Sequence, residues 1–562
     1  MQNKLFVFEK LFIFKVLVSL FFIGLICCLI ACDSKTVDSI KVLTIVAGSE
    51  SREIEPLIQE FAAQNNFAVE MTYKGSVDMM LDLQKPQFPY DAVLAANSIW
   101  IRMGDRDLHR VSDETSIMRS PVVLGVKKSL ARELGWINKD VTVQDILNTV
   151  RHKKLKFAMT SATQSNSGAS AYIGLLFALA GKPDILDSSH LANLKIQSDI
   201  KEIFGGMERG SGSSGWLNEM FISQYDILNA MFNYEAMVIS LNRQLENQGK
   251  EPLYVVYPTD GLAIADSTIG FVNKQDNTGK ENSTEKKDIA DKKELFIKLK
   301  DYLVSDNAQE KILKTGFRTG LIGMNPEKAD KSIYNPAWGI DLKRSISPIP
   351  WPSVDVIKEA LSLYQTTLRK PSYTAYLLDV SGSMQGEGMN QLKQAMTGLL
   401  DPGSAGKYLL QTSSQDIIVV LTFNHGVVKG WKISGSKPDD MATLMDNINQ
   451  LQPNGGTNIY LPVMNALDIL SKEGANIYKY LVSIILMTDG MSNDGNLEDV
   501  KTHLEKIKKV NSDFTLPPIF GVTFGSADDR QLKDIAGFST ARVFDGRKEG
   551  LVKAFREAKG YN

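Results

Sequence analysis

Apolar runs alternate with helical patterns from residue 41 onward. Residues 42–47 are a continuous apolar run that ends at Gly48, which is typical of a buried parallel strand leading into a turn. Residues 52–64 carry apolar side chains at helical spacing, and residues 67–73 alternate as a second strand. Later segments of the same kind predict strands at 91–98, 121–126, 156–159 and 269–272 and helices at 169–180 and 294–304. This β-α-β order predicts an α/β domain over residues 41–334.

A second series of strands and helices fills residues 372–562. Apolar runs predict strands at 373–378, 417–423, 481–487 and 518–524, and helical spacing predicts helices at 440–451, 460–470 and 497–510. Alternation of this kind predicts a doubly wound sheet, in which ligands bind beyond the carboxyl ends of the strands.

Two segments interrupt these patterns. Residues 335–353 contain Pro336, Pro348, Pro350 and Pro352 together with Trp338 and Trp351, so residues 335–371 are predicted to be a semi-rigid linker that ends in a helix. Residues 273–293 are rich in Asn, Asp, Glu, Lys, Ser and Thr and are predicted to be a solvated polar insertion.

The first 31 residues have the pattern of an export signal. Lys4, Lys10 and Lys15 precede an apolar stretch at 16–31, which is shorter than the ~20 residues that a membrane span needs. The tetrad at 29–32, Leu-Ile-Ala-Cys, resembles the bacterial lipobox, and this resemblance implies cleavage before Cys32 and acylation of its sulfur. Residues 32–40 would then be a lipidated tether that holds the chain at a membrane, outside the cytoplasm. The alternative is an uncleaved signal anchor.

Composition and charge exclude several classes of protein. The 562 residues are 43% hydrophobic and 23% charged, which fits neither a disordered chain nor a protein with many membrane spans. The 63 basic and 65 acidic residues leave a net charge of −2, and the basic residues form no stripe, so we expect no nucleic-acid partner. The cysteines are confined to positions 27, 28 and 32 and the five histidines are scattered, which argues against a zinc site.

One loop carries a candidate metal site. Asp379, Ser381 and Ser383 follow a predicted strand at i, i+2 and i+4, where their oxygens can converge on one hard cation. Thr457 lies in a Gly-Gly-Thr loop, and Asp489 follows another apolar strand. A loop of Ser and Asp that only caps a helix is the alternative, but capping requires neither this spacing nor Asp489.

These three segments together resemble the metal-ion-dependent adhesion site of von Willebrand factor A domains. The resemblance covers residues 372–559 or so, and it implies that Ser381 and Ser383 ligate Mg²⁺ or Mn²⁺ directly. It implies that Thr457 binds directly or through water, and that Asp379 and Asp489 act mainly through water. It also implies a protein partner that presents Asp or Glu to the metal.

Four features of the first domain resemble type II periplasmic solute-binding proteins. They are the strand at 42–47 followed by Gly-Ser-Glu at 48–50, the segment 90–94, the helix start at 165–168 and the segment 257–261. This resemblance implies two lobes, residues 42–118 with 265–330 and residues 119–264, that close on a solute. Hydroxyl and amide donors at strand ends suit a small anionic or carboxylate-bearing solute. The predicted contacts are Ser49, Arg52, Asn97, Ser98, Ser165, Ser167 and Gly168. The alternatives are plain helix capping at 165–168 and a two-lobed domain that binds nothing.

The sequence therefore predicts a two-lobed solute-binding-like α/β domain followed by a doubly wound, Rossmann-like von Willebrand A domain. The expected function is that of a membrane-anchored binding protein without enzymatic activity. A solute receptor of an ABC transporter with an accessory A domain is the first alternative. A metal-dependent hydrolase is the second, and it lacks an evident general base because no His or Glu lies in 379–384 or 488–493.

Overall fold

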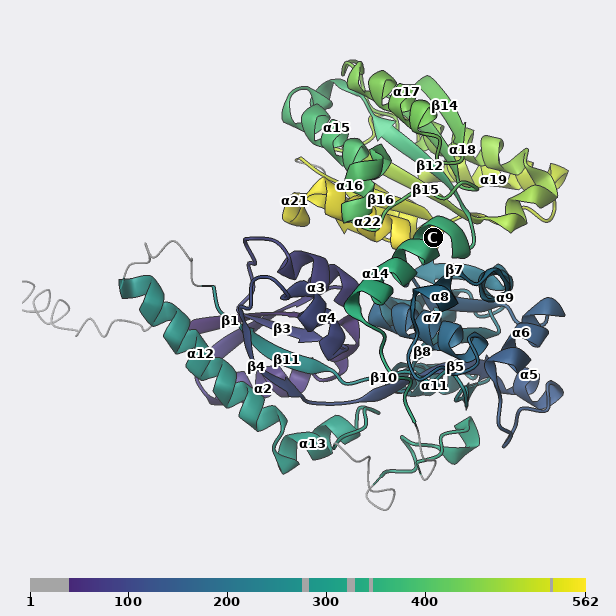
Figure 1. Ribbon diagram of the computed structural model, residues 1–562. Coiled ribbons are helices and arrows are strands. Elements are labelled where there is room, and N and C mark those ends of the chain that lie inside the picture. The colour runs from purple at the N-terminus through teal and green to yellow at the C-terminus, as the bar shows by residue number, and fades with distance from the viewer. Residues whose placement is uncertain (1–39, 275–282, 321–328, 343–346, 526–528, 562) are drawn as a thin grey trace, which may run out of the picture.

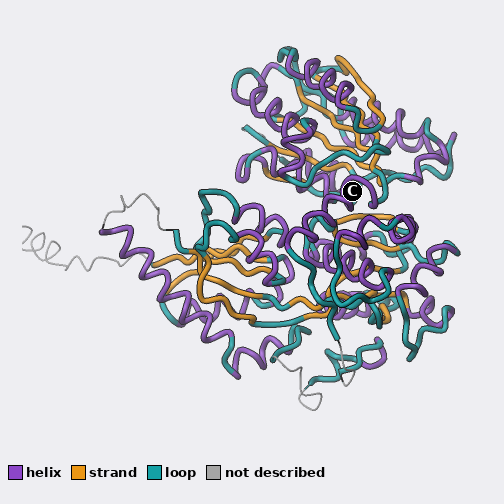
Figure 2. Tube along the Cα trace, in the orientation of Figure 1, coloured by secondary structure: helices purple, strands orange, loops and turns teal. Residues whose placement is uncertain are grey.

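The computed structural model describes residues 40–274, 283–320, 329–342, 347–525 and 529–561, so Cys32 and the predicted signal peptide lie outside the described residues. Within these residues, three sheets form the framework, and helices cover them (Figures 1 and 2). Two sheets belong to the first half of the chain, and the third forms the C-terminal domain above them in Figure 1. The mixed α/β fold class predicted from the sequence is confirmed.

Lobe one is built on a five-stranded sheet in the order β2-β1-β3-β11-β4. Its strands are β1 (Lys41–Ala47), β2 (Phe67–Tyr73), β3 (Ala92–Ala95), β4 (Val111–Ser116) and β11 (Thr268–Val272). The helical segments η1 (Ser49–Glu53), α2 (Glu55–Gln64), α3 (Ser76–Leu83) and α4 (Ser98–Gly104) follow β1, β2 and β3. Because β1 pairs in parallel with β2 and β3, the loops after these strands share one edge of the sheet.

Lobe two has a six-stranded sheet built around β5 and β8. The strands are β5 (Ser120–Lys127), β6 (Phe157–Thr160), β7 (Met207–Ser211), β8 (Ala230–Tyr234), β9 (Leu253–Val256) and β10 (Ile264–Ala265). The helices that matter below are α7 (Asn166–Leu179), α9 (Leu194–Gly205), α10 (Ser214–Ser223) and α11 (Glu235–Asn247). Helix α7 has Asn166, Ser167 and Ser170 near its start and is mainly apolar beyond them, and it is buried for most of its length.

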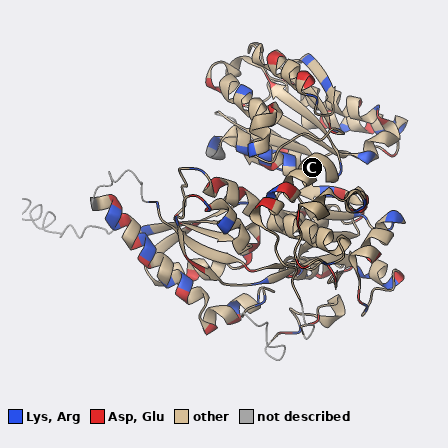
Figure 3. Ribbon diagram, viewed as in Figure 1, with Lys and Arg blue, Asp and Glu red and all other residues tan. Residues whose placement is uncertain are grey.

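Helix α12 (Ser283–Leu303) corrects one expectation. The sequence predicted a polar insertion at 273–293 and a helix that begins at Glu294, whereas the helix already begins at Ser283. Lys, Glu, Asp and Ala are compatible with a helix, and Lys292 pairs with Asp288 one turn earlier. Figure 3 shows residues of both charges interspersed along this helix. Residues 283–293 are therefore polar and largely exposed, but helical.

The linker packs against the lobes through its aromatic residues. Trp338 in η2 (Pro336–Trp338) is buried, and Trp351 packs edge-on against Trp100 of α4. Helix α14 (Val354–Leu363) follows, and the Tyr172 hydroxyl donates to the Ala360 carbonyl at 3.0 Å. The linker thus fixes the C-terminal domain close to lobe two.

The C-terminal domain has a six-stranded sheet in the order β14-β13-β12-β15-β16-β17. The strands are β12 (Ser372–Asp379), β13 (Ile417–Phe423), β14 (Val427–Ser434), β15 (Leu481–Thr488), β16 (Ile519–Thr523) and β17 (Val543–Asp545). Helices α15 (Glu387–Leu400) and α22 (Leu551–Gly560) share one apolar core, and α18 (Tyr460–Ser471) and α19 (Leu497–Val510) share another. β12 pairs in parallel with β13 and β15, so the loops after these strands meet at one edge.

Candidate functional site

Asp379 ends the central strand β12 and is fully buried. One carboxylate oxygen accepts a hydrogen bond from the Ser381 backbone N–H at 2.7 Å. The other oxygen accepts a hydrogen bond from the Thr488 hydroxyl at 2.6 Å. These two bonds, one from its own loop and one from the end of β15, fix the orientation of the carboxylate.

The other predicted oxygen ligands lie next to Asp379. Ser381 Oγ is 3.1 Å from Ser383 Oγ, and Ser383 Oγ donates to Asp489 Oδ1 at 2.8 Å. Neighbouring ligands of an octahedral Mg²⁺ with bonds of ~2.1 Å lie ~3 Å apart, so these spacings suit such an ion. Among the described residues no three His, Cys, Asp or Glu side chains form a metal-binding group, so this set combines hydroxyls with two carboxylates.

The loop that carries Thr457 is hydrogen-bonded to the loop after β12. Gly382 N–H donates to the Gly455 carbonyl at 2.9 Å, and Gly455 has a φ of 78°, a conformation that glycine adopts without strain. The Thr457 carbonyl accepts from Asn493 N–H at 2.8 Å, which ties this loop to the segment after Asp489. The structure therefore brings all three segments of the predicted metal site together at one sheet edge.

Two acidic groups in this small volume are electrostatically unfavourable without a cation. Burial, together with a smaller contribution from the neighbouring charge of Asp489, raises the pKa of Asp379 to about 6, although the hydrogen bonds from Thr488 and Ser381 act in the opposite direction. Burial also raises the pKa of Asp489. A divalent cation would offset both costs, so the residues present fit the group that the resemblance implies.

Part of the predicted solute site forms a hydroxyl cluster where the lobes meet. Ser167 Oγ lies 2.8 Å from Ser214 Oγ and 2.8 Å from Thr160 Oγ1, and Ser165 Oγ lies 3.3 Å from Ser214 Oγ. Ser49 of lobe one joins it, because its hydroxyl accepts from Gly215 N–H at 3.0 Å. Gly168 packs tightly against Thr160, since a Cβ on Gly168 would lie 2.1 Å from the Thr160 carbonyl oxygen.

The other predicted solute contacts lie elsewhere. The Asn97 side chain caps α4 and donates to the Ile264 carbonyl at 3.2 Å, and Ser98 donates through its N–H and hydroxyl to Asp266. The Arg52 guanidinium lies 4.7 Å from the centre of the Tyr73 ring. These three residues are thus engaged outside the serine cluster.

Glu50 is a residue of the lobe junction that the sequence analysis did not single out. It is 4% exposed, and its Oε1 is buried without a hydrogen-bond partner. Burial raises its pKa to about 7. Burial also raises the pKa of Tyr234, to which the charge of Glu50 adds, and the Tyr234 hydroxyl accepts a hydrogen bond from Asn166 at 3.0 Å. Its place directly after Ser49, at the end of a parallel strand, is the signal that could have identified it.

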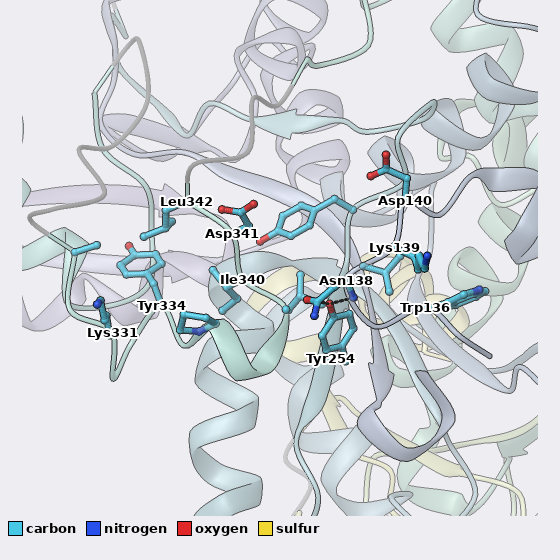
Figure 4. Close-up of a pocket in the computed structure, with 16 residues that line it drawn as sticks. Trp136, Asn138, Lys139, Asp140, Tyr254, Lys331, Tyr334, Ile340, Asp341 and Leu342 are labelled. Atoms are coloured by element: carbon cyan, nitrogen blue, oxygen red, sulfur yellow. Dashed lines mark hydrogen bonds between the residues drawn. The ribbon is translucent and has the colours of Figure 1, made fainter. Parts of the chain in front are cut away.

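A separate pocket lies between lobe two and the linker. It has a volume of about 550 Å³, with Tyr334 and Asp341 on one side and Trp136 on the other (Figure 4). The Tyr254 hydroxyl accepts from Asn138 N–H at 2.9 Å within its wall. None of the residues predicted to bind solute lines it.

Comparison with known families confirms the solute-binding and von Willebrand factor A domains. Residues 43–318 match the family described as bacterial extracellular solute-binding protein, and residues 375–557 match the von Willebrand factor type A domain. The chain therefore contains a solute-binding domain of an extracytoplasmic family followed by a von Willebrand factor A domain, and domains of the second kind are often metal-dependent. Among the described residues, no helix has the length and apolar character to cross a membrane.

Individual relatives cover parts of the chain. Inter-alpha-trypsin inhibitor heavy chain H2 of Mus musculus is 34% identical over 146 residues, and the match spans 25% of this chain and 14% of that protein. The sulfate-binding protein SubI of Mycobacterium tuberculosis H37Rv has 15% identity and a TM-score of 0.38, over 56% of this chain and 96% of that one. A von Willebrand factor type A structure from Catenulispora acidiphila has 18% identity and a TM-score of 0.28, over 35% of this chain and 43% of that one.

Proposed function

We propose that this chain, a solute-binding domain joined to a von Willebrand factor A domain, is a membrane-anchored extracytoplasmic binding protein without a catalytic step. Its A domain holds Mg²⁺, or Mn²⁺, and binds a protein partner through an Asp or Glu of that partner. Its two-lobed domain binds a small solute. The observation that carries the proposal is the hydrogen-bonded set of Ser381, Ser383 and Asp489 beside the fixed carboxylate of Asp379.

The proposed metal ligands divide into two groups. Ser381 and Ser383 would bind the cation directly and Thr457 directly or through water, while Asp379 and Asp489 would act mainly through water. Neutral hydroxyls as direct ligands leave the cation with most of its charge. The metal then supplies a position that a carboxylate of the partner fills. Thr488 and the Ser381 N–H keep Asp379 oriented for this role.

The membrane anchor is proposed at Cys32. Acylation of its sulfur, after cleavage of residues 1–31, would place the chain on the outer side of a membrane, and residues 33–40 would serve as a short tether. Several acyl chains at ~0.8 kcal/mol per buried methylene hold a protein at a membrane far better than one chain. An extracytoplasmic solute-binding family fits this location.

The solute proposal rests on the lobe junction. Ser165, Ser167 and Ser214 offer hydroxyls at the start of α7 and α10, where N–H groups and the helix dipoles favour a carboxylate or another anionic group. Glu50 adds a buried carboxyl whose Oε1 has no partner. It favours a solute that also carries a hydrogen-bond donor, such as an ammonium group.

Metal binding by the purified full chain tests the first part of the proposal. Mn²⁺ titration followed by electron paramagnetic resonance, repeated by Mg²⁺ calorimetry, is expected to give one site that EDTA empties. Ser383→Ala should abolish that site, whereas Ser436→Ala, which removes an exposed serine of the same domain, should leave it unchanged. Equal Mn²⁺ affinity in both variants would contradict the assignment.

A thermal-shift screen tests the solute. Amino acids, amines, sulfate and phosphate are the probes, and a ligand at a hundredfold excess over its Kd stabilises the folded state by ~2.7 kcal/mol. The double variant Ser167→Ala, Ser214→Ala should lose the shift, while Ser98→Ala should retain it. Absence of any shift across the panel would refute solute binding.

A further inference from the structure

The two lobes are closed onto each other through direct backbone contacts. Val77 N–H in lobe one donates to the Gln164 carbonyl in lobe two at 3.1 Å. Gly75 lies so close that a Cβ on it would be 2.0 Å from the same carbonyl oxygen. Trp100 Nε1 also donates across the junction to Asn166 Oδ1 at 2.6 Å. This arrangement exists only while the lobes are closed.

Helix α22 of the A domain reaches this junction (Figure 1). Its Arg556 is 4% exposed, and Nε lies 2.5 Å from Asp78 Oδ1 of lobe one. Arg556 Nη2 donates to the Thr163 carbonyl of lobe two at 2.6 Å. The Gln164 side-chain amide donates back to the Arg556 carbonyl. One guanidinium therefore bridges both lobes from a third part of the chain.

At Gly212, lobe two leaves room for Tyr561, which directly follows the same helix. A Cβ on Gly212 would lie 2.3 Å from the Tyr561 ring, and Trp216 packs edge-on against that ring with centroids 4.7 Å apart. Elsewhere between lobe two and the A domain, the Gln224 side-chain amide donates to Thr540 Oγ1 at 2.7 Å. The surface that receives α22 is thus shaped for it, with polar partners at Asp78, Thr163 and Gln164.

We propose that the lobe junction is the binding surface for α22, and that Arg556 fastens the lobes in the closed position. Opening the lobes would move Asp78 away from Thr163, so Arg556 would lose one of its two partners. Nη1 of this guanidinium is already buried without a hydrogen-bond partner, so loss of a second bond would be costly and Arg556 would leave the junction. Closure of the lobes and docking of the A domain therefore stabilise each other, and exchange of anything held between the lobes requires α22 to undock.

Distances between spin labels test this in the full chain. Cys27, Cys28 and Cys32 are replaced by serine, and no other cysteine occurs in the sequence, so labels can be placed at will. The pair Ala63→Cys on α2 and Lys201→Cys on α9 reports lobe opening, since both residues are exposed. The pair Ala63→Cys and Glu505→Cys on α19 reports docking of the A domain.

Arg556→Gln is expected to lengthen and broaden both distance distributions. The matched control Arg547→Gln removes an arginine of the same domain that pairs within that domain with Asp545, and it should change neither distribution. Gly75→Ala should separate the lobes from inside the first domain and thereby also undock the A domain. Far-ultraviolet circular dichroism checks that each variant is folded. If Arg556→Gln does not fold, Asp78→Asn is measured in its place.

Unchanged lobe distances in folded Arg556→Gln or Asp78→Asn would overturn the proposal. It would also be overturned if Gly75→Ala opened the lobes while the A domain stayed docked, because the two events would then be independent. Lobe opening together with undocking in both kinds of variant would support it. Metal binding does not enter these measurements, so their failure would leave the metal proposal untouched.

Discussion

Arg556 and Asp78 form a buried ion pair across 478 residues of sequence, with Nε and Oδ1 2.5 Å apart. The pair joins the last helix of the A domain to the first turn of α3 in lobe one. Burying two charges is costly, and the attraction between them compensates only where the geometry is good and further hydrogen bonds are made. Arg556 meets that condition in part, because Nη2 donates to the Thr163 carbonyl while Nη1 is buried without a hydrogen-bond partner.

This pair predicts a strong and non-additive effect on stability. Arg556→Ala and Asp78→Ala should each lower the free energy of unfolding by ~3–5 kcal/mol, because each removes the hydrogen-bonded ionic partner of a buried charge. The double variant should lose clearly less than the sum of the two. Urea unfolding of the four proteins measures this coupling. Arg547→Ala, which removes a surface ion pair, should cost at most ~1 kcal/mol, and additive losses would contradict the coupling.

At the metal site, we expect Asp489→Ala to abolish Mg²⁺-dependent binding while the domain remains folded. The substitution removes an oxygen donor at the sheet edge rather than apolar core volume, and Asp489 contacts Ser383 through one hydrogen bond. Calorimetry with MgCl₂ and a melting curve measure the two properties. Asp440→Ala, at an exposed position of the same domain, serves as the control, and an unchanged Mg²⁺ affinity of Asp489→Ala would count against the site.

Membrane attachment depends on one atom in the proposal, the sulfur of Cys32. Cys32→Ser is therefore expected to yield a protein that incorporates no labelled palmitate and stays unprocessed or is released. Cys28→Ser, the matched control within the apolar stretch, should be labelled as the wild type is. Labelled palmitate on Cys32→Ser would show that the acylation point lies elsewhere.

The proximity of the proposed metal ligands could be predicted from the sequence because it depends on one short loop and on parallel strand pairing. Asp379, Ser381 and Ser383 belong to one loop, and two apolar strands place Asp489 beside them by parallel pairing. β14 was missed because it lies at the sheet edge and is largely exposed, so it lacks the apolar run that marked its neighbours. The start of α12 was missed for a similar reason, since its first turns are polar.

Only some of the residues predicted to contact a solute lie together in the structure, because side chains compete for hydrogen-bond partners that the sequence does not reveal. Ser98 and Ser167 have the same side chain, but Ser98 donates its hydrogen bonds to Asp266, which lies 168 positions further along the chain. Arg556 lay outside every predicted site, since nothing in its helix indicates that lobe one supplies a carboxylate. Contacts between domains depend on how the domains dock, and the spacing of residues along the chain does not predict the docking geometry.

Glu50 predicts an unusual dependence of stability on pH. Burial raises its pKa from 4.5 to about 7, so between these values the folded chain binds more protons at this site than the unfolded chain does. Stability must then fall as pH rises through that window, which is the opposite of what a carboxylate in an ion pair contributes. At ~1.4 kcal/mol per pH unit, the loss amounts to ~3 kcal/mol.

The variant Glu50→Gln removes this titration while it preserves the shape of the side chain. Urea unfolding from pH 4.5 to pH 8 should therefore show the wild type losing ~3 kcal/mol relative to Glu50→Gln, with the two closest at the acidic end. The exposed control Glu505→Gln should follow the wild type across the whole range. A solute that brings a cation to Glu50 should remove the difference, because an ionised Glu50 would then have a partner at neutral pH. Parallel curves for wild type and Glu50→Gln would show that Glu50 does not titrate in this window, and the argument for a donor-bearing solute would lose its basis.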